Sequence, residues 1–291
     1  MADTPVITLN NGVEIPQLGL GVWQASPAET EAAVRFAIAE AGYRHIDTAA
    51  AYRNEEAVGR GIAASRVPRD EVFVTTKLWN SDHGADRAGP ALDASLRRLG
   101  LDHVDLVLIH WPLQDAARRI ETWLALEAAL GAGKARAIGV SNFTAEQLEE
   151  VIAAGSIVPA VNQVELHARF PQQPLRAFCR TRGIAVESWS PLGGAPGSWG
   201  GETNTLLGDP IVAAVARRHE RSPAQVLIRW HLQQGLIAIP KSVHPDRIRQ
   251  NIEVFDFELD AGDLLALASL ETGERIGADP LEANWGARPT S

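Results

Sequence analysis

Several residue types and patterns are scarce or missing in this sequence, and each absence excludes a class of protein. A single cysteine, Cys179, among 291 residues rules out an internal disulfide framework and a cysteine-rich metal site. No stretch comes near the roughly 20 consecutive apolar residues that a membrane-spanning helix needs. Lysine and arginine number 27 against 36 acidic residues, and the resulting net charge of −9 argues against nucleic acid or an anionic membrane as a partner.

The start of the chain and its overall length set two further expectations. The first residues, MADTPVITLN, are neither a basic nor an apolar leader, which favours a cytoplasmic location. No Pro- or Ser-rich linker and no block of charge divides the chain. With 45% hydrophobic and 22% charged residues the chain can bury a full core. Because α/β barrels of about 250 residues fold as one unit, we expect a single domain over residues 1–291.

Short β-branched segments alternate with amphipathic Ala- and Leu-rich segments along the whole chain. Residues 6–16 predict a hairpin, because Asn11-Gly12 supplies the positive-φ pair of a tight turn. Several later segments are nearly continuous apolar runs, as expected for strands that are buried on both faces of a parallel sheet. Eight strands are expected after the hairpin, at 18–23, 45–49, 72–79, 104–111, 135–142, 161–167, 185–191 and 237–242.

Helical segments separate the expected strands. The first follows the cap residue Ser26, begins at Pro27 and stops at Gly42. Two segments lie between the seventh and eighth strands, so one of them is an addition to the repeat. The expected helices cover 27–42, 53–65, 86–100, 119–133, 144–155, 209–219, 222–234 and 260–271. The pattern predicts a (β/α)8 TIM barrel with an N-terminal β-hairpin at the bottom and two extra helices; an open, doubly wound sheet is the alternative.

Polar residues at the carboxyl ends of the strands are the candidates for chemistry, because active sites of such barrels lie on the loops that follow those ends. The second strand ends at Asp47, and Tyr52 lies in the loop after it. The third strand ends near Lys77 and the fourth near His110, so four side chains converge on one rim. An apolar substrate pocket is expected to be walled by Trp23, Trp79, His110 and Trp111.

These four side chains suit the protonation of a carbonyl oxygen. A phenol has a reference pKa of about 10, so Tyr52 needs a group that stabilises its phenolate. The Lys77 ammonium would do this and lower the pKa, with Asp47 holding the ammonium charged and in place. His110 can donate a hydrogen bond to the substrate oxygen. Since the set holds no obvious nucleophile and no redox centre, a reduction would require a hydride from a nicotinamide cofactor.

Five segments in chain order carry a resemblance to a known family: GYRHIDTAAAYRNEEAVG, TTKLW, LIHWP, GVSNF and IPKSVHPDRIRQN. With these the sequence resembles the aldo-keto reductases. The segments VNQVELH, ESWSPLGG and VFDFEL are most similar to the bacterial 2,5-diketo-D-gluconate reductase branch. The resemblance implies a small-molecule carbonyl substrate, a monomer, and a catalytic tetrad of Tyr52, Asp47, Lys77 and His110.

The resemblance also implies where a cofactor would bind. Trp189 would stack on the nicotinamide ring, and Lys241 and Arg247 would face the 2′-phosphate. Two cations near a strand end suit a phosphorylated dinucleotide in an acidic protein, which favours NADPH/NADP+ over NADH. The expected cofactor contacts are Val22, Trp23, Ser141, Asn142, Gln163, Trp189, Ser190, Leu192, Gly193, Lys241, Ser242, Val243, Arg247, Gln250 and Asn251.

The expected function is therefore NADPH-dependent reduction of aldehydes and ketones to alcohols. One alternative is a regulatory barrel that binds NADPH with negligible turnover. Another is a metal-dependent barrel hydrolase, for which the candidate site offers one histidine and the sequence no HExxH or zinc spacing. The sequence leaves open the natural substrate and whether residues 193–205 and 273–291, with Trp285, close over the site.

Overall fold

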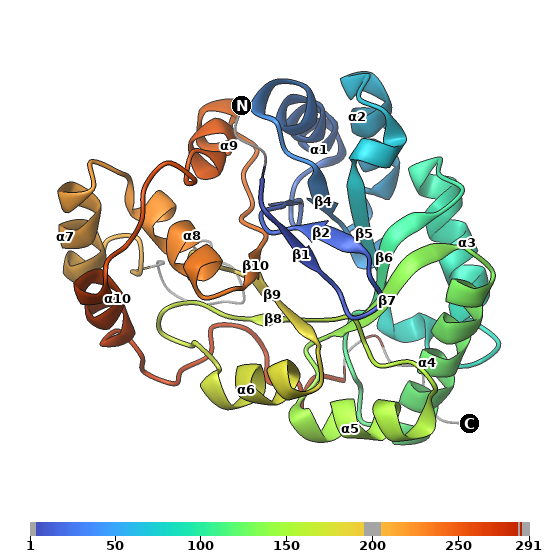
Figure 1. Ribbon diagram of the computed structural model, residues 1–291. Coiled ribbons are helices and arrows are strands. Elements are labelled where there is room, and N and C mark those ends of the chain that lie inside the picture. Colours follow the sequence, from blue (N-terminus) through green and yellow to red (C-terminus); the bar gives the residue numbers. More distant parts are fainter. Residues whose placement is uncertain (1–3, 195–204, 285, 287–291) are drawn as a thin grey trace.

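Eight parallel strands form the centre of the protein in the computed structural model, which describes residues 4–194, 205–284 and 286 (Figure 1). The strands are β3 (Leu20–Gly21), β4 (His45–Asp47), β5 (Phe73–Leu78), β6 (Val104–Ile109), β7 (Ala135–Ser141), β8 (Val161–Glu165), β9 (Ala185–Trp189) and β10 (Ile237–Ala238). Each strand pairs with the next one in the chain, and all pairs are parallel.

The sheet closes into a barrel, because the segments around its first and last strands are also hydrogen-bonded to each other. The Gly19 N–H donates to the Ala238 carbonyl at 2.9 Å, and the Ala238 N–H donates to the Gln17 carbonyl at 3.0 Å. A parallel bridge between Gly21 and Lys241 extends this seam. The closed (β/α)8 barrel is thereby confirmed, and the open-sheet alternative is wrong.

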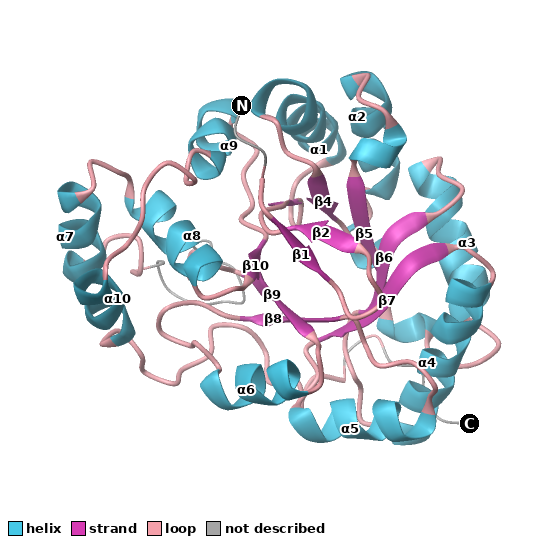
Figure 2. Ribbon diagram, in the orientation of Figure 1, coloured by secondary structure: helices cyan, strands magenta, loops and turns pink. Residues whose placement is uncertain are grey.

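Helices surround the strands on the outside (Figure 2). One helix follows each strand and covers the barrel: α1 (Pro27–Phe36), α2 (Glu55–Ser65), α3 (Ala88–Leu99), α4 (Ala116–Gly131), α5 (Ala145–Ala154), α6 (Gln173–Thr181), α8 (Pro223–Gln233) and α9 (Pro245–Ile252). The two additional helices, α7 (Pro210–Arg218) and α10 (Ala261–Ala268), lie beside each other outside α8. They are the two extra helices that the sequence predicts.

Two of the barrel helices, α6 and α9, were not among the expected helical segments. Both are short, and their sequences QPLRAFCRT and PDRIRQNI are polar on average. In α6 only Cys179 is fully buried, and in α9 only Ile248 and Asn251 are. Leu175, Phe178 and Cys179 of α6 and Ile248 and Ile252 of α9 are at helical spacing and belong to the core. A periodic signal was therefore present, but it rests on few positions in segments that are otherwise polar.

The N-terminal hairpin covers the bottom of the barrel, as predicted. Its strands β1 (Val6–Thr8) and β2 (Glu14–Pro16) pair antiparallel, with Ile7 opposite Ile15. Ile15 is fully buried and packs with Phe73, Val161 and Ile237, each at the beginning of its strand. The hairpin crosses in front of the ring of strands in Figure 1. The open end of the barrel is therefore the opposite one, where the strands end.

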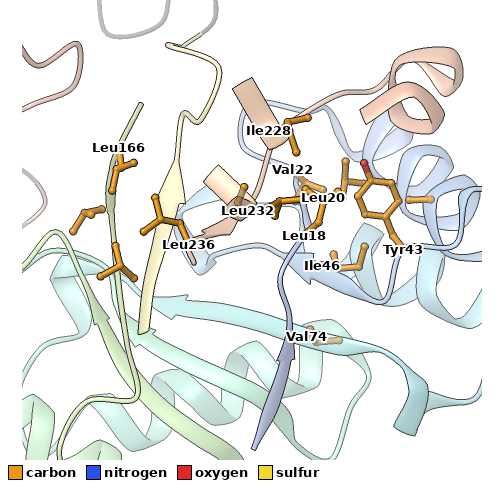
Figure 3. Close-up of a cluster of buried hydrophobic side chains, with 14 of the residues drawn as sticks. Leu18, Leu20, Val22, Tyr43, Ile46, Val74, Leu166, Ile228, Leu232 and Leu236 are labelled. Carbon is orange, nitrogen blue, oxygen red and sulfur yellow. The ribbon is translucent and has the colours of Figure 1, made fainter. Parts of the chain in front are cut away.

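A second and larger core lies between the strands and the helices. Figure 3 shows part of it, with Leu18, Leu20 and Val22 close to Ile228 and Tyr43. Reciprocal side-chain caps start several of the covering helices. In α5, for example, Thr144 Oγ1 accepts from the Gln147 N–H at 3.3 Å, and Gln147 Oε1 accepts from the Thr144 N–H at 3.0 Å. This cap holds the loop between β7 and α5 at the open end.

Candidate active site

A cleft of about 1500 Å³ opens at the carboxyl ends of the strands, on the side opposite the hairpin. Asp47, Ser141 and Trp189 line it, and each is the last residue of its strand. The alternation of side chains along a strand explains why polar groups gather here. On β5, Phe73 packs in the core at the bottom of the barrel, and Lys77 follows four residues later on the same face. On β6, Leu106 and Leu108 belong to that core, and His110 follows on their face just after the strand ends.

The four expected catalytic residues come together in this cleft. Lys77 Nζ donates to Asp47 Oδ1 at 2.6 Å, to the Thr48 carbonyl at 3.0 Å and to Tyr52 Oη at 3.3 Å. The His110 ring meets the Tyr52 ring edge-on, with centroids 5.6 Å apart. Lys77 itself is fully buried behind Tyr52, whereas Asp47, Tyr52 and His110 line the cleft. The ammonium group thus joins the carboxylate to the phenol.

Burial and the Asp47–Lys77–Tyr52 contacts shift the pKa values of three groups at the site, Tyr52, Lys77 and His110. Burial raises the pKa of Tyr52, and the nearby Lys77 ammonium opposes that rise without reversing it. The sequence predicts that Lys77 lowers the Tyr52 pKa. The effect of Lys77 does have that sign, but the loss of hydration on burial has a larger effect, so the net shift is upward. Burial also opposes the charge on Lys77, yet Asp47 and Tyr52 raise its pKa. Burial followed by Lys77 lowers the pKa of His110 well below its usual range. At neutral pH the site therefore holds a neutral phenol, an ammonium and a neutral imidazole.

A hydrogen-bonded corner lies beside these groups, at the ends of β7, β8 and β9. Ser141 Oγ donates to the Gln163 carbonyl at 2.8 Å, and Asn142 Nδ2 donates to the His110 carbonyl at 3.0 Å. Trp189 Nε1 donates to Asn142 Oδ1 at 2.8 Å. Asn142 has a φ of +66°, a conformation that asparagine tolerates better than most residues. The corner connects the indole of Trp189 to the loop that carries His110.

The far end of the cleft is basic. Lys241 and Arg247 are exposed and line it, and neither forms an ion pair with an acidic residue in the described part of the chain. In a protein of net charge −9, two such cations beside one cleft suit an anionic group of a ligand. The other expected cofactor residues that line the cleft are Trp23, Ser190, Leu192, Ser242, Val243, Gln250 and Asn251. The cleft and its donors therefore fit a phosphorylated dinucleotide.

Two of the expected cofactor residues do not line the cleft. The Val22 side chain is buried in the outer core (Figure 3). Its carbonyl accepts from Asn54 Nδ2 at 2.9 Å. Strand alternation places Val22 on the face opposite the barrel interior, so only its backbone is near the site. Gly193 instead closes a turn, since its N–H donates to the Ser190 carbonyl at 2.9 Å.

The expected substrate pocket has aromatic walls. Trp23, Trp79 and Trp111 line the cleft together with His110, and the rings of Trp79 and His110 meet edge-on with centroids 5.2 Å apart. Residues 195–204 of the expected closing loop and Trp285 of the tail lie outside the described residues.

Two buried acids at the site were missed in the sequence. Glu165 accepts from the backbone N–H groups of Ile276 and Gly277, at 2.6 and 3.0 Å, and so ties the C-terminal segment to β8. A Cβ atom on Gly277 would lie 2.4 Å from the Trp189 ring, so this segment runs directly against the indole. Glu187 on β9 is equally buried and accepts from Gln163. The available signal was an acid inside an otherwise buried strand, in VNQVELH and AVESWSP.

The described residues hold neither a cluster of metal ligands nor a helix that could span a membrane. Within residues 4–194, 205–284 and 286, no three His, Cys, Asp or Glu side chains are grouped so that they could hold a metal ion. None of the helices in that part of the chain is both long and apolar enough to cross a bilayer.

Comparison with known proteins gives consistent matches over nearly the whole chain. Residues 17–271 match the model of the aldo/keto reductase family. An aldo-keto reductase of Mycolicibacterium smegmatis is 53% identical over 97% of this chain and 99% of its own. Morphine 6-dehydrogenase of Pseudomonas putida is 53% identical over 97% of this chain and 96% of its own. A crystal structure of a Bombyx mori aldo-keto reductase in complex with NADP is 41% identical, covers 95% of each chain and has a TM-score of 0.87.

The two relatives are named as a reductase and a dehydrogenase. These names do not favour the alternative of a regulatory barrel with negligible turnover. The resemblance to the 2,5-diketo-D-gluconate reductase branch stays a prediction, because the family match does not decide the branch.

Proposed function

The chain belongs to the aldo/keto reductase family, and from that premise we propose that Tyr52 protonates the substrate oxygen in its reaction. The enzyme is an NADP-dependent oxidoreductase that acts on carbonyl groups. The observation that supports the role of Tyr52 is the position of Lys77 Nζ, which donates both to Asp47 and to the phenol oxygen.

NADPH, when bound, supplies the hydride that reduces the carbonyl carbon. The residues of this chain handle the oxygen. Neutral His110 has an N–H to donate to the carbonyl oxygen, which would direct that oxygen toward Tyr52. Tyr52 then gives up its proton, and the Lys77 ammonium at 3.3 Å stabilises the phenolate that forms. Asp47 keeps the ammonium charged in a place without solvent.

The raised pKa of Tyr52 agrees with a role as an acid. A group that donates a proton must hold it when the substrate arrives, and burial keeps the phenol protonated at neutral pH. The adjacent ammonium acts on the product of the transfer, because it interacts more strongly with a phenolate than with a phenol. The interaction is therefore largest where charge develops on the phenol oxygen.

For the cofactor we propose three groups of contacts. Ser141, Asn142 and Gln163 would bind the carboxamide, and Trp189 would lie against the nicotinamide ring. Lys241 and Arg247 would bind the 2′-phosphate, because both cations line the basic end of the cleft. Preference for NADPH over NADH follows from these two charges. The other proposed contacts are the backbone of Val22 and residues Trp23, Ser190, Leu192, Gly193, Ser242, Val243, Gln250 and Asn251.

We also propose that residues 1–291 form one domain that works as a monomer in the cytoplasm. In the described residues the helices and strands belong to a single closed barrel, and both cores are parts of it. Few large hydrophobic side chains are exposed in the described part, and they are distributed over β1, α4, α10 and the C-terminal segment: Val6, Leu124, Leu265, Ile276 and Leu281. Light scattering after gel filtration tests this, since a monomer has a mass of 31.3 kDa.

The substitution Tyr52→Phe tests the proposed function. Phenylalanine keeps the ring and removes the proton, so kcat for NADPH oxidation with a panel of aldehydes is expected to fall by roughly 10²- to 10⁴-fold. The dissociation constant for NADPH should stay within about twofold, because the proposed contacts of the cofactor are elsewhere. A Tyr52→Phe protein as active as the wild type would overturn the role of Tyr52.

A further inference from the structure

One buried carboxyl group beside the site takes no part in the proposed proton transfer. Glu187 lies on β9, opposite Gln163 of β8, and two residues before Trp189 on the same strand face. Its side chain is fully buried. Burying a carboxyl group costs free energy unless the group makes hydrogen bonds in the folded protein. The contacts of Glu187 therefore indicate its role.

Its main contact is the side-chain amide of Gln163. Gln163 Nε2 donates to Glu187 Oε2 at 2.8 Å and to Asp47 Oδ2 at 2.8 Å. An amide nitrogen has two hydrogens, and both are used by these two carboxyl groups. The amide oxygen has no hydrogen to offer the Asp47 carboxylate or Glu187 Oε2, so these two acceptors determine which way the amide faces. Oε1 is left for the cleft, which Gln163 lines next to Ser141 and Asn142.

We propose that Glu187 is a positioning residue that, together with Asp47, holds the Gln163 amide with its oxygen toward the carboxamide NH2 of the bound nicotinamide. The inference rests on the proposed function, because it assumes that Gln163 contacts the cofactor. The terminal torsion of glutamine is soft, so an amide held on one side only can rotate. With Asp47 alone, Gln163 can turn an N–H toward the carboxamide NH2, and two donors then face each other.

The charges around Glu187 are compatible with this role. Asp47 is paired with the Lys77 ammonium at 2.6 Å, and no lysine or arginine among the described residues forms an ion pair with Glu187. Burial, followed by the charge of Asp47, raises the pKa of Glu187 to about 8. Burial lowers the pKa of His45, whose Nε2 lies 3.6 Å from Glu187 Oε1, to about 4. At neutral pH the two groups are therefore a neutral acid and a neutral imidazole rather than an ion pair.

A neutral acid at this position has a close structural mimic in glutamine. In Glu187→Gln the amide oxygen can accept from Gln163 Nε2 as Oε2 does, and the NH2 group takes the place of the protonated oxygen. In Glu187→Met and Glu187→Leu no acceptor is left for Gln163. Glu187→Gln should therefore behave like the wild type, and Glu187→Met and Glu187→Leu should not. If only the negative charge of Glu187 mattered, all three substitutions would have the same effect.

The experiment compares two dinucleotides in the full-length protein at pH 7, by titration of tryptophan fluorescence. NADP+ has the carboxamide NH2, and its 3-acetylpyridine analogue has a methyl ketone in that place. In the wild type NADP+ should bind more tightly than the analogue. In Glu187→Met the dissociation constant for NADP+ should rise roughly five- to tenfold and that for the analogue less than twofold, so the preference disappears. In Glu187→Gln the preference should stay.

Two controls keep the outcome interpretable. Val186→Ala removes a neighbouring side chain that packs in the outer core, so it should lower the melting temperature and leave the preference unchanged. Glu187→Leu replaces the methionine variant if that one does not fold. Equal preferences in the wild type and the apolar variants would overturn the positioning role alone. A wild-type protein that binds neither dinucleotide would instead overturn the proposed function.

Discussion

Lys77 is a fully buried lysine whose ammonium depends on three protein oxygens, those of Asp47, Thr48 and Tyr52. Each partner is 25 to 30 residues away in the chain, and the parallel arrangement of β4 and β5 brings them within hydrogen-bond distance. A buried charge of this kind is tolerated only when it is paired. At the scale of single residues, the site is therefore one coupled unit rather than four independent groups.

Lys77→Met is expected to cost both stability and activity. The substitution leaves the Asp47 carboxylate buried without its cation, and the free energy of unfolding should fall by about 3–5 kcal/mol. Carbonyl reduction should be lost, since no group remains to stabilise the phenolate. Urea denaturation and NADPH oxidation measure the two effects.

The double variant Asp47→Asn with Lys77→Met provides the matched control. It removes both charges, and so most of the lost stability should return while activity stays absent. If the single variant is as stable as the wild type, the pair does not have the coupling proposed here.

At the scale of elements, segments rich in apolar residues were predicted, and two helices that are polar on average were not. The hairpin and the eight strands were expected in their observed order, and the strands proved to be shorter, as β10 (Ile237–Ala238) illustrates. Its expected range extended to residue 242, but after Ala238 the chain turns into the loop that carries Lys241. Helices α6 and α9 were not predicted because their periodic apolar positions are few and the rest of each segment is polar.

Ile15→Ala is expected to weaken the hairpin plug without affecting the site. Ile15 is fully buried at the bottom of the barrel, and its loss leaves a cavity among Phe73, Val161 and Ile237. The free energy of unfolding should fall by about 2–5 kcal/mol. The dissociation constant for NADPH should not change, because the cleft is at the opposite end.

Val6→Ala on the same hairpin is the comparison for that experiment. Val6 is 49% exposed, so its truncation should cost no more than about 0.5 kcal/mol. Equal losses for the two variants would show that the hairpin does not seal the barrel as its packing indicates.

At the scale of the whole molecule, buried titratable groups set how stability depends on pH. Burial lowers the pKa of His45, His83 and His231 to about 4 from an ordinary 6.5. Unfolding exposes these rings, so between pH 6.5 and 4 the unfolded chain binds protons that the folded protein does not. Glu187 acts in the opposite sense, since its pKa is raised from 4.5 to about 8. Its contribution to stability is lost as pH rises through that range.

We therefore expect the free energy of unfolding to rise from pH 4 to 6.5 and to decline from 6.5 to 8. Three histidines outweigh one carboxyl group in the acid range, and Glu187 acts alone above it among these four groups. His83→Gln should flatten the acid side of the curve, and Glu187→Gln should flatten the alkaline side. Denaturant titrations at intervals of half a pH unit provide the measurement, and a wild-type curve without a maximum would contradict the assignment.

From the sequence alone, the repeat of strands and helices, the residues at the strand ends and the basic segment at Lys241 and Arg247 could be predicted. Each of these is a local property, because periodicity and turn chemistry are carried by neighbouring residues. The tertiary structure decided the rest. Gln163 reaches Asp47 across 116 residues and Glu165 holds Ile276 across 111, and no local pattern records such contacts. Burial at those contacts also determined that the pKa of Tyr52 is raised, because desolvation depends on what the folded chain places around a group.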